Sequence, residues 1–337
     1  MMTRPHDPGP AAAREQAQLV DGNAEHPIAS AQRGAIRVGT ASWTDPTLTA
    51  PGVFYPRGAT TAEDRLRYYA SCFSLVEIDA TYYALPTRRM AELWMERTPP
   101  DFTFDCKANA LMTGQPTEIS RLPADLRAAL PESLASKPRI YGAELPNELY
   151  DTVWSRFIDA LEPLRSSGKL GSVLLQYPRW FTPRAENREA ILEAHERLGD
   201  LRGAVELRNG LWFTERNAER TLAFFEEHRI PFVMVDEPQG LRSSVPPMVA
   251  VTSPAISIVR FHGRRADTWE KRGISVAERF RYFYDKTELA EWVPRIEEAA
   301  AAANEVHVIM NNCYANYGTT NALQLSAMLG EASPTGS

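Results

Sequence analysis

The sequence predicts an α/β fold, a TIM (β/α)8 barrel with long loops after strands 3 and 7. Three observations carry this prediction. From residue 36 onward, short β-rich apolar runs alternate with longer amphipathic runs, the pattern of a parallel sheet built from βα units. Eight such β-rich runs can be counted, which is the number that closes a barrel. Polar and charged residues follow the C-terminal ends of these runs, where barrels of this class carry their sites.

The eight expected strands are short, apolar and rich in β-branched and aromatic residues. In chain order they span residues 36–40, 75–79, 103–107, 172–176, 204–208, 232–236, 256–262 and 306–311. Their length and their separation by helical patterns favour one parallel sheet over an antiparallel sandwich.

The expected helices show apolar residues at helical spacing. Thr60 with Glu63 predicts a capping box at the start of the first helix, and Thr87 predicts the start of the second. Pro294 lies inside another helical pattern, so we expect that helix to be kinked or to start later than its pattern suggests. The later helices are expected at about 151–164, 187–201, 217–228, 287–303 and 320–329.

Two connections are too long for simple βα turns, at residues 108 to about 148 and 263 to 286. Both leave C-terminal strand ends, where long insertions are usually lids or binding loops. We expect one domain at residues 34–330, preceded by a disordered tail at 1–33 and followed by another at 331–337. The first tail is expected to be dispensable, because its composition offers little to bury.

The composition excludes several classes of protein. With 337 residues, 44% hydrophobic and 24% charged, the chain is expected to be globular, and its net charge of −6 argues against a dedicated nucleic-acid coat protein. Its three cysteines lie far apart, which supports neither a disulfide framework nor a cysteine-based zinc site. Because the sequence shows neither a signal peptide nor a membrane-spanning run, we expect a cytoplasmic protein with no membrane partner. The oligomeric state stays open.

The strand ends carry the candidate site. Side chains two residues apart in a strand share a face, so parity shows which residues point into the barrel. Uncompensated buried charge is costly, so the polar residues on that face must pair with each other, be hydrated or bind a ligand. We expect them to converge at one end of the barrel; counted back from each strand end, they are Thr40, Ser42, Glu77, Asp79, Asp105, Lys107, Gln176, Glu206, Arg208, Asp236, Arg260, His262 and Asn311.

Three interpretations of these residues stay open. They can form a salt-bridge network, for example between Glu206 and Arg208 or Arg260. They can bind an anion, because Lys107, Arg208 and Arg260 favour phosphate or carboxylate. They can bind a hard metal through oxygen and imidazole ligands, although the neighbouring cations oppose this; the ligands would be Glu77, Asp79, Glu206, Asp236 and His262. We expect no cofactor, with a divalent metal as the alternative.

The loop after the seventh strand mixes basic and aromatic residues. This composition suits a nucleic-acid backbone with stacked bases, and equally a solvated amphipathic segment. Its residues are Arg264, Arg265, Trp269, Lys271, Arg272, Arg279, Arg281, Tyr282, Phe283 and Tyr284.

Motifs at the strand ends extend from about residue 36 to 329. They include Gly39-Thr40-Ala41-Ser42-Trp43, Phe54-Tyr55-Pro56, Glu77-Ile78-Asp79-Ala80-Thr81-Tyr82-Tyr83, Gln176-Tyr177-Pro178, Glu206-Leu207-Arg208, Arg260-Phe261-His262-Gly263 and Asn311-Asn312. With these motifs the chain resembles the YecE-like family, known as a domain of unknown function. The resemblance implies a TIM barrel with a site at the strand ends, and it supplies no reaction. Its fold looks like that of metal-dependent apurinic endonucleases and sugar isomerases.

One departure from the family pattern concerns catalysis. Many members carry a histidine just after the threonine of the loop motif that follows the third strand. This chain reads Met112-Thr113-Gly114-Gln115-Pro116 there. If Gln115 occupies that position, a mechanism that needs an acid or base at this point is in doubt.

We therefore expect an enzyme that acts on an anionic, phosphate-bearing substrate. Glu77 or Glu206 would be the general base and His262 the general acid. The alternatives are a non-catalytic protein that binds nucleic acid or a nucleotide, and a divalent-metal nuclease or sugar isomerase. The expected substrate-binding residues are Trp43, Asp79, Tyr82, Lys107, Gln176, Arg208, Asp236, Arg260, Asn311 and Asn312.

Overall fold

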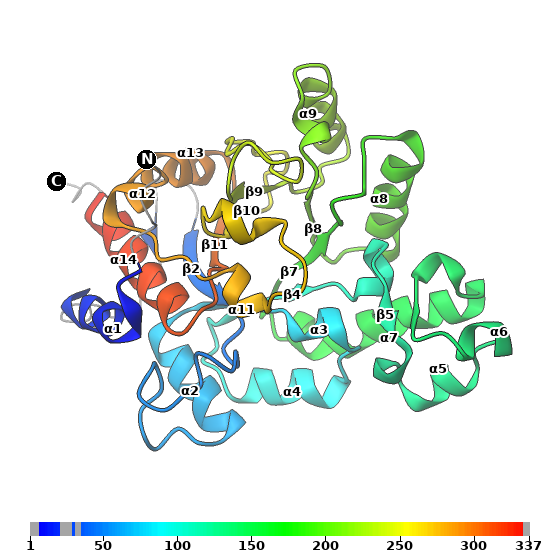
Figure 1. Ribbon diagram of the computed structural model, residues 1–337, viewed down its shortest axis with the longest axis horizontal. Helices are drawn as coiled ribbons and strands as arrows, with labels where there is room; N and C mark the ends of the chain where they lie inside the picture. The colour runs from blue at the N-terminus through cyan, green and yellow to red at the C-terminus, as the bar shows by residue number, and fades with distance from the viewer. Residues whose placement is uncertain (1–6, 21–28, 31–34, 333–337) are drawn as a thin grey trace. The chain divides into compact units, whose positions relative to one another are not determined.

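The computed structural model of the chain describes residues 7–20, 29–30 and 35–332. Within these residues, eight parallel strands alternate with helices along the chain, as Figure 1 shows from blue to red. The fold class is a TIM (β/α)8 barrel, as the sequence predicts. The chain divides into two compact units: the first contains Met1–Glu77 and Gly210–Ser337, and the second contains Ile78–Asn209.

The first unit contains five of the parallel strands. Apolar residues such as Val38, Val308 and Ile309 are buried in this sheet. A short additional strand, β1 (Ala29–Ser30), pairs antiparallel with β2. The parallel strands, in spatial order, are β3 (Leu75–Ile78), β2 (Ala35–Ala41), β11 (Glu305–Met310), β10 (Ser257–Phe261) and β9 (Val233–Asp236).

The second unit contains three parallel strands in the order β4 (Thr103–Lys107), β7 (Leu170–Gln176) and β8 (Gly203–Glu206). The long connection after β4 holds an antiparallel pair, β5 (Thr117–Glu118) with β6 (Arg139–Ile140). It also contains short helical turns, which are η1 (Ala110–Thr113), η2 (Ile119–Arg121), α5 (Ala124–Ala128), α6 (Glu132–Ala135) and η3 (Gly142–Glu144).

Each predicted strand is present, with boundaries that differ by at most two residues. The differences concern the site, because five candidate residues lie just beyond the observed strand ends: Ser42, Asp79, Arg208, His262 and Asn311. At His262 and Asn311 the backbone N–H groups still bond to the Asp236 and Phe261 carbonyls of the neighbouring strands. Asp79 instead precedes helix α3, so strand parity does not apply to it.

The predicted helices are also present: α2 (Ala62–Cys72), α4 (Arg88–Glu96), α7 (Asn147–Ser166), α8 (Ala185–Leu198), α9 (Ala218–Glu227) and α14 (Tyr317–Ala332). Thr87 caps α4 as predicted. The capping box of α2 lies one residue later than predicted, because Thr61 and Asp64 exchange the two hydrogen bonds in place of Thr60 and Glu63. Pro294 lies in the first turn of α13 (Val293–Ala302), which follows the separate short helix α12 (Lys286–Ala290). This confirms the later start.

The remaining helices are short and lie in the connections. They are α3 (Ala80–Tyr83), η4 (Gly210–Phe213), α10 (Ala266–Trp269) and α11 (Val276–Arg279). The connection from β9 to β10 contains no helix. None of the helices in the described part of the chain is long and apolar enough to span a membrane.

The prediction of a disordered tail at 1–33 does not hold for Gly9–Val20, which form helix α1 beside α14 (Figure 1). Ala13 is fully buried against Phe283 and Tyr317. The Ala13 carbonyl accepts a hydrogen bond from Thr320 Oγ1 at 3.2 Å. The small Ala13 side chain allows α1 to pack closely on α14. The composition of the segment does not indicate this packing. The prediction is also wrong for Ala29–Ser30, which form β1, and for the start of the second tail, because α14 extends to Ala332. The parts of the predicted tails at residues 1–6, 21–28, 31–33 and 333–337 lie outside the described residues.

Candidate functional site

Four polar residues at the strand ends of the second unit form a connected group, which we call the Lys107 cluster: Lys107, Gln176, Glu206 and Arg208. Lys107 Nζ donates to Gln176 Oε1 at 2.8 Å, and Gln176 Nε2 donates to Glu206 Oε1 at 2.7 Å. Arg208 Nη1 donates to the same glutamate oxygen at 3.0 Å. Because β4, β7 and β8 are neighbours in a parallel sheet, their last residues lie side by side. The four residues carry two cations and one carboxylate.

Solvent reaches the Lys107 cluster unevenly. The Glu206 side chain is fully buried, whereas 17% of the Arg208 side chain is exposed. Lys107 and Gln176 are both partly buried. The cluster is therefore a half-buried cationic surface that rests on a buried carboxylate, an arrangement that favours an anion.

Tyr82 and Gln115 extend this cluster. The Lys107 ammonium lies 4.5 Å from the centre of the Tyr82 ring. Tyr82 donates its hydroxyl hydrogen to Gln115 Oε1 at 2.8 Å, and Gln115 Nε2 donates to the Gln176 carbonyl at 2.9 Å. Burial raises the pKa of Tyr82 to about 12, so it remains a hydrogen-bond donor at neutral pH. Gln115 thus lies at the candidate site and links its parts, but its amide cannot transfer a proton.

Asp79 and Asp105 do not join the contacts described for the Lys107 cluster. Asp105 is buried and accepts a hydrogen bond from Ser172 at 2.8 Å. Asp79 precedes helix α3 at the N-cap position without a side-chain cap hydrogen bond. Thr81, the second residue of α3, donates its hydroxyl hydrogen to the Lys107 carbonyl at 2.6 Å. This bond holds α3 against the end of β4.

In the first unit, Glu77 and Arg260 form a buried two-point ion pair. Arg260 Nε donates to Glu77 Oε2 at 2.9 Å, and Nη2 donates to Oε1 at 2.7 Å. Both side chains are only 1% exposed. The Arg260 guanidinium, one of the three cations expected to bind an anion, is therefore held by a carboxylate of the protein. This agrees with the salt-bridge interpretation, but the partner is Glu77 and not Glu206.

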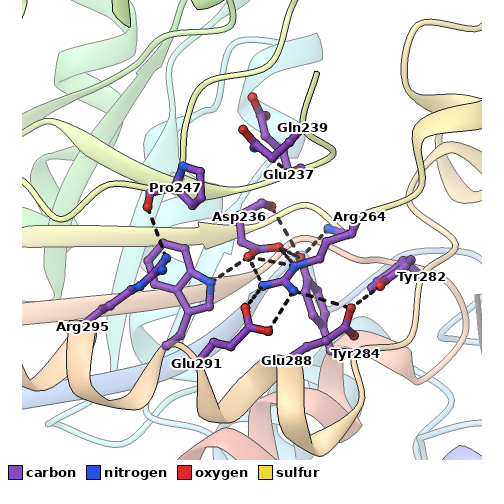
Figure 2. Close-up of polar contacts among 12 residues, drawn as sticks. Asp236, Glu237, Gln239, Pro247, Arg264, Tyr282, Tyr284, Glu288, Glu291 and Arg295 are labelled. Carbon is purple, nitrogen blue, oxygen red and sulfur yellow. Dashed lines mark hydrogen bonds and ion pairs between the residues drawn. The ribbon is translucent and has the colours of Figure 1, made fainter. Parts of the chain in front are cut away.

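Asp236, at the end of β9, is the acceptor of a second network in this unit (Figure 2). It accepts hydrogen bonds from the Tyr284 hydroxyl and from Trp292 Nε1, each at 2.7 Å. Arg264 adds an ion pair at 2.7 Å. Burial and the charge of Asp236 raise the pKa of Tyr284 well above its usual value, so this hydroxyl stays protonated. The carboxylate thus fastens the loop after β10 and helix α13 to the end of β9.

His262 and Asn311 form a contact that links the imidazole tautomer to the orientation of the Asn311 amide. Asn311 Nδ2 is 2.8 Å from His262 Nδ1. With the amide nitrogen as donor, Nδ1 accepts and the proton of the neutral ring lies on Nε2. The imidazole is 1% exposed and lies beside the rings of Trp269 and Phe280. His262 can therefore offer a proton through one defined atom.

Two other predicted substrate-binding residues are buried. Asn312 donates to the Tyr282 carbonyl at 2.9 Å and to Asn321 Oδ1 at 2.8 Å, and it is fully buried. Trp43 is 7% exposed, and its carbonyl accepts the Tyr55 hydroxyl hydrogen. The contacts of Asn312 tie elements of the fold together.

Four arginines of the loop after β10 have partners within the protein, whereas Arg272 is exposed. Arg264 contacts Glu291 as well as Asp236, and Arg265 pairs with Asp267 and Glu278. Arg279 donates to backbone carbonyls, and Arg281 pairs with Asp7 at 2.6 Å. Trp269, Phe283 and Tyr284 are buried. These contacts favour the structural interpretation of this loop over a nucleic-acid surface.

Within the described ranges, no group of three or more His, Cys, Asp or Glu side chains could hold an ion. Glu77 and Asp236 instead pair with arginines. Metal binding stays a prediction for direct analysis.

Sequence reasoning did not identify the partners of Asp236. Arg264, Tyr284 and Trp292 come from a loop and a helix start, where no periodicity marks a site. The aromatic and basic composition of that loop was the available signal. It indicates an exposed segment, whereas Trp269, Phe283 and Tyr284 are buried and Arg264 is paired with Asp236.

Comparison with known proteins places the chain in a family. The model of "Protein of unknown function DUF72" matches residues 37–336. The UPF0759 protein YunF of Bacillus subtilis (strain 168) is 30% identical over 297 residues, covering 87% of this chain and 94% of YunF.

Solved structures agree with this. A DUF72 family protein from Enterococcus faecalis V583 is 27% identical with a TM-score of 0.68, covering 88% of this chain and 96% of that one. Another from Thermotoga maritima MSB8 is 28% identical with a TM-score of 0.67, covering 87% and 98%. The YecE-like resemblance denotes the same family. The chain therefore belongs to the DUF72 family of proteins of unknown function.

Proposed function

We propose that the protein is an enzyme that acts on a small anionic, phosphate-bearing substrate, bound by the Lys107 cluster. The observation that carries this proposal is the chain of hydrogen bonds from Lys107 through Gln176 to Glu206 and Arg208. It holds two cations at neighbouring strand ends, and strand ends of this kind are where barrel enzymes bind their substrates.

The roles within the cluster follow from its geometry. Lys107 offers a compact charge with several N–H donors, and Arg208 offers a planar fork suited to two phosphate oxygens. Gln176 uses its amide oxygen toward Lys107 and its amide nitrogen toward Glu206, so its orientation is fixed. Glu206 is the proposed general base, as the carboxylate that Gln176 and Arg208 contact in this cluster. The role of His262 as general acid stays a prediction.

Binding of inorganic phosphate and of AMP, measured by calorimetry and by thermal melts, tests the proposal. A ligand that binds only the folded state raises the melting temperature. Lys107→Met is expected to weaken binding about tenfold or more, because it removes a charged hydrogen bond. Lys137→Met is the matched control, since Lys137 is an exposed lysine of the same unit. Equal binding by the two variants would contradict the proposal.

Two further measurements separate the alternatives. A nucleic-acid binder would bind short oligonucleotides with an affinity that falls steeply as salt increases. The paired arginines of the loop after β10 predict that this response is absent. Metal analysis of protein purified without chelator tests the divalent-metal nuclease or isomerase.

A further inference from the structure

The connection from β2 to α2 and the start of α2, in the first unit, line a cavity of about 610 Å³ that is open to solvent. This volume is within the range of small-molecule sites. The cavity is lined by part of the Phe54-Tyr55-Pro56 motif, to which the proposed function assigns no role. Ala50, Pro51 and Pro56 contribute apolar surface to it.

Two arginines line this cavity, Arg57 and Arg65. None of the ten described residues that line it is acidic. Across the described ranges, neither guanidinium forms an ion pair. Arg57 is exposed, and the buried Arg65 Nε has no hydrogen-bond acceptor. Other arginines of this unit, such as Arg260 and Arg264, are matched to carboxylates. The cavity therefore carries positive charge that these residues do not balance.

Contacts to the surrounding structure hold the walls of the cavity. Tyr55 donates its hydroxyl hydrogen to the Trp43 carbonyl, and its ring packs edge-on against Phe54 at 4.9 Å. Arg14 Nη1, from helix α1, donates to the Gly52 carbonyl at 2.6 Å. The hydroxyl groups of Thr49 and Thr60 belong to lining residues and add hydrogen-bonding capacity.

We propose that this cavity binds a small organic anion, with a phosphate or carboxylate head held by Arg57 and Arg65 and an apolar body against the prolines. An arginine pair favours such a head because each planar fork matches two oxygen atoms. This site uses none of the residues of the Lys107 cluster, so it goes beyond the proposed function.

Calorimetric titration with phenyl phosphate tests the site, with benzoate to distinguish a carboxylate head and phenol as the neutral probe. Saturable binding of either anion is expected, and phenol should bind at least tenfold more weakly. Arg57→Met and Arg65→Met should each weaken anion binding about tenfold, corresponding to one charged hydrogen bond. Arg67→Met, on the exposed side of the same helix, is the matched control and should bind as the original protein does.

Arg65→Lys keeps the charge and is expected to bind more strongly than Arg65→Met. It also keeps the test valid if Arg65→Met does not fold. Lys107→Met should remove the part of phenyl phosphate binding that belongs to the Lys107 cluster and leave a second saturable site. That remaining binding should be lost in the double variant Lys107→Met/Arg65→Met, which separates this site from the Lys107 cluster. The proposal is overturned by absence of saturable binding, by unchanged affinity in the Arg57 and Arg65 variants, or by loss of all binding in Lys107→Met alone.

Discussion

The two units each place an arginine and a glutamate at strand ends, but the two pairs differ in burial. In the first unit, Arg260 and Glu77 are both 1% exposed and joined at two points. In the second, Glu206 is fully buried while Arg208 is 17% exposed and shares the glutamate with Gln176. The two pairs have the same residue types at similar positions and differ in the exposure of the arginine. Solvent access is therefore what distinguishes Arg208, a candidate binding group, from Arg260, a member of a buried ion pair.

Arg260→Met is expected to have the largest effect on stability. It leaves Glu77 buried without its partner, which typically costs about 3 to 5 kcal/mol. Arg208→Met is the matched variant, with an expected cost of about 1 kcal/mol, because Gln176 still donates to Glu206. Denaturant unfolding measures both free energies. Equal losses would remove the distinction between the two pairs, and so would a stable Arg260→Met.

Truncation of the chain to start at Gly34 is expected to have the next largest effect. It should lower the free energy of unfolding by about 2 kcal/mol or more. It removes the packing of Ala13 and side-chain hydrogen bonds such as Gln324 to Gln16, each worth about 1 kcal/mol net. A chain that starts at Asp7 keeps α1 and is the control. Because the lost contacts belong to the first unit, phosphate binding by the Lys107 cluster should persist. A truncated chain that melts like the control would show that α1 contributes little.

The smallest expected effect is the loss of stability at acidic pH that follows protonation of Asp7. Burial alone would raise the pKa of this carboxyl, but hydrogen bonds from Tyr317 and Arg281 outweigh burial and lower it. A lowered folded-state pKa contributes stability above about pH 4, which is lost as the pH falls through the folded value. Asp7→Asn should therefore melt closer to the original protein at pH 3 than at pH 7. A constant difference between the two would contradict this contribution.

The sequence predicts the fold and the residues at the strand ends because both depend on local pattern. Lys107, Gln176 and Glu206 were recognised from parity alone, since a parallel sheet aligns the ends of its strands. Their hydrogen-bonded contact in the second unit follows from that alignment. Convergence of the complete set of strand-end residues stays a prediction.

Other features could not be predicted because they depend on loops or on packing at long range. Gln115 reaches the Lys107 cluster from a loop whose course no periodicity determines. Helix α1 is stabilised by α14, about 300 residues away along the chain, as the bond from Thr320 to Ala13 shows. Composition alone could not reveal that partner.

The order of the chain has a consequence for how the protein forms during synthesis. The second unit is one continuous stretch, Ile78–Asn209, so β4, β7 and β8 can pair as soon as it has left the ribosome. The first unit is split: β2 must wait for β11, and α1 must wait for α14. The edge of β2 that pairs with β11 and the face of α1 that packs on α14 therefore remain uncovered until β11 and α14 have been synthesised. This is the stage at which a nascent chain most depends on chaperones to prevent aggregation.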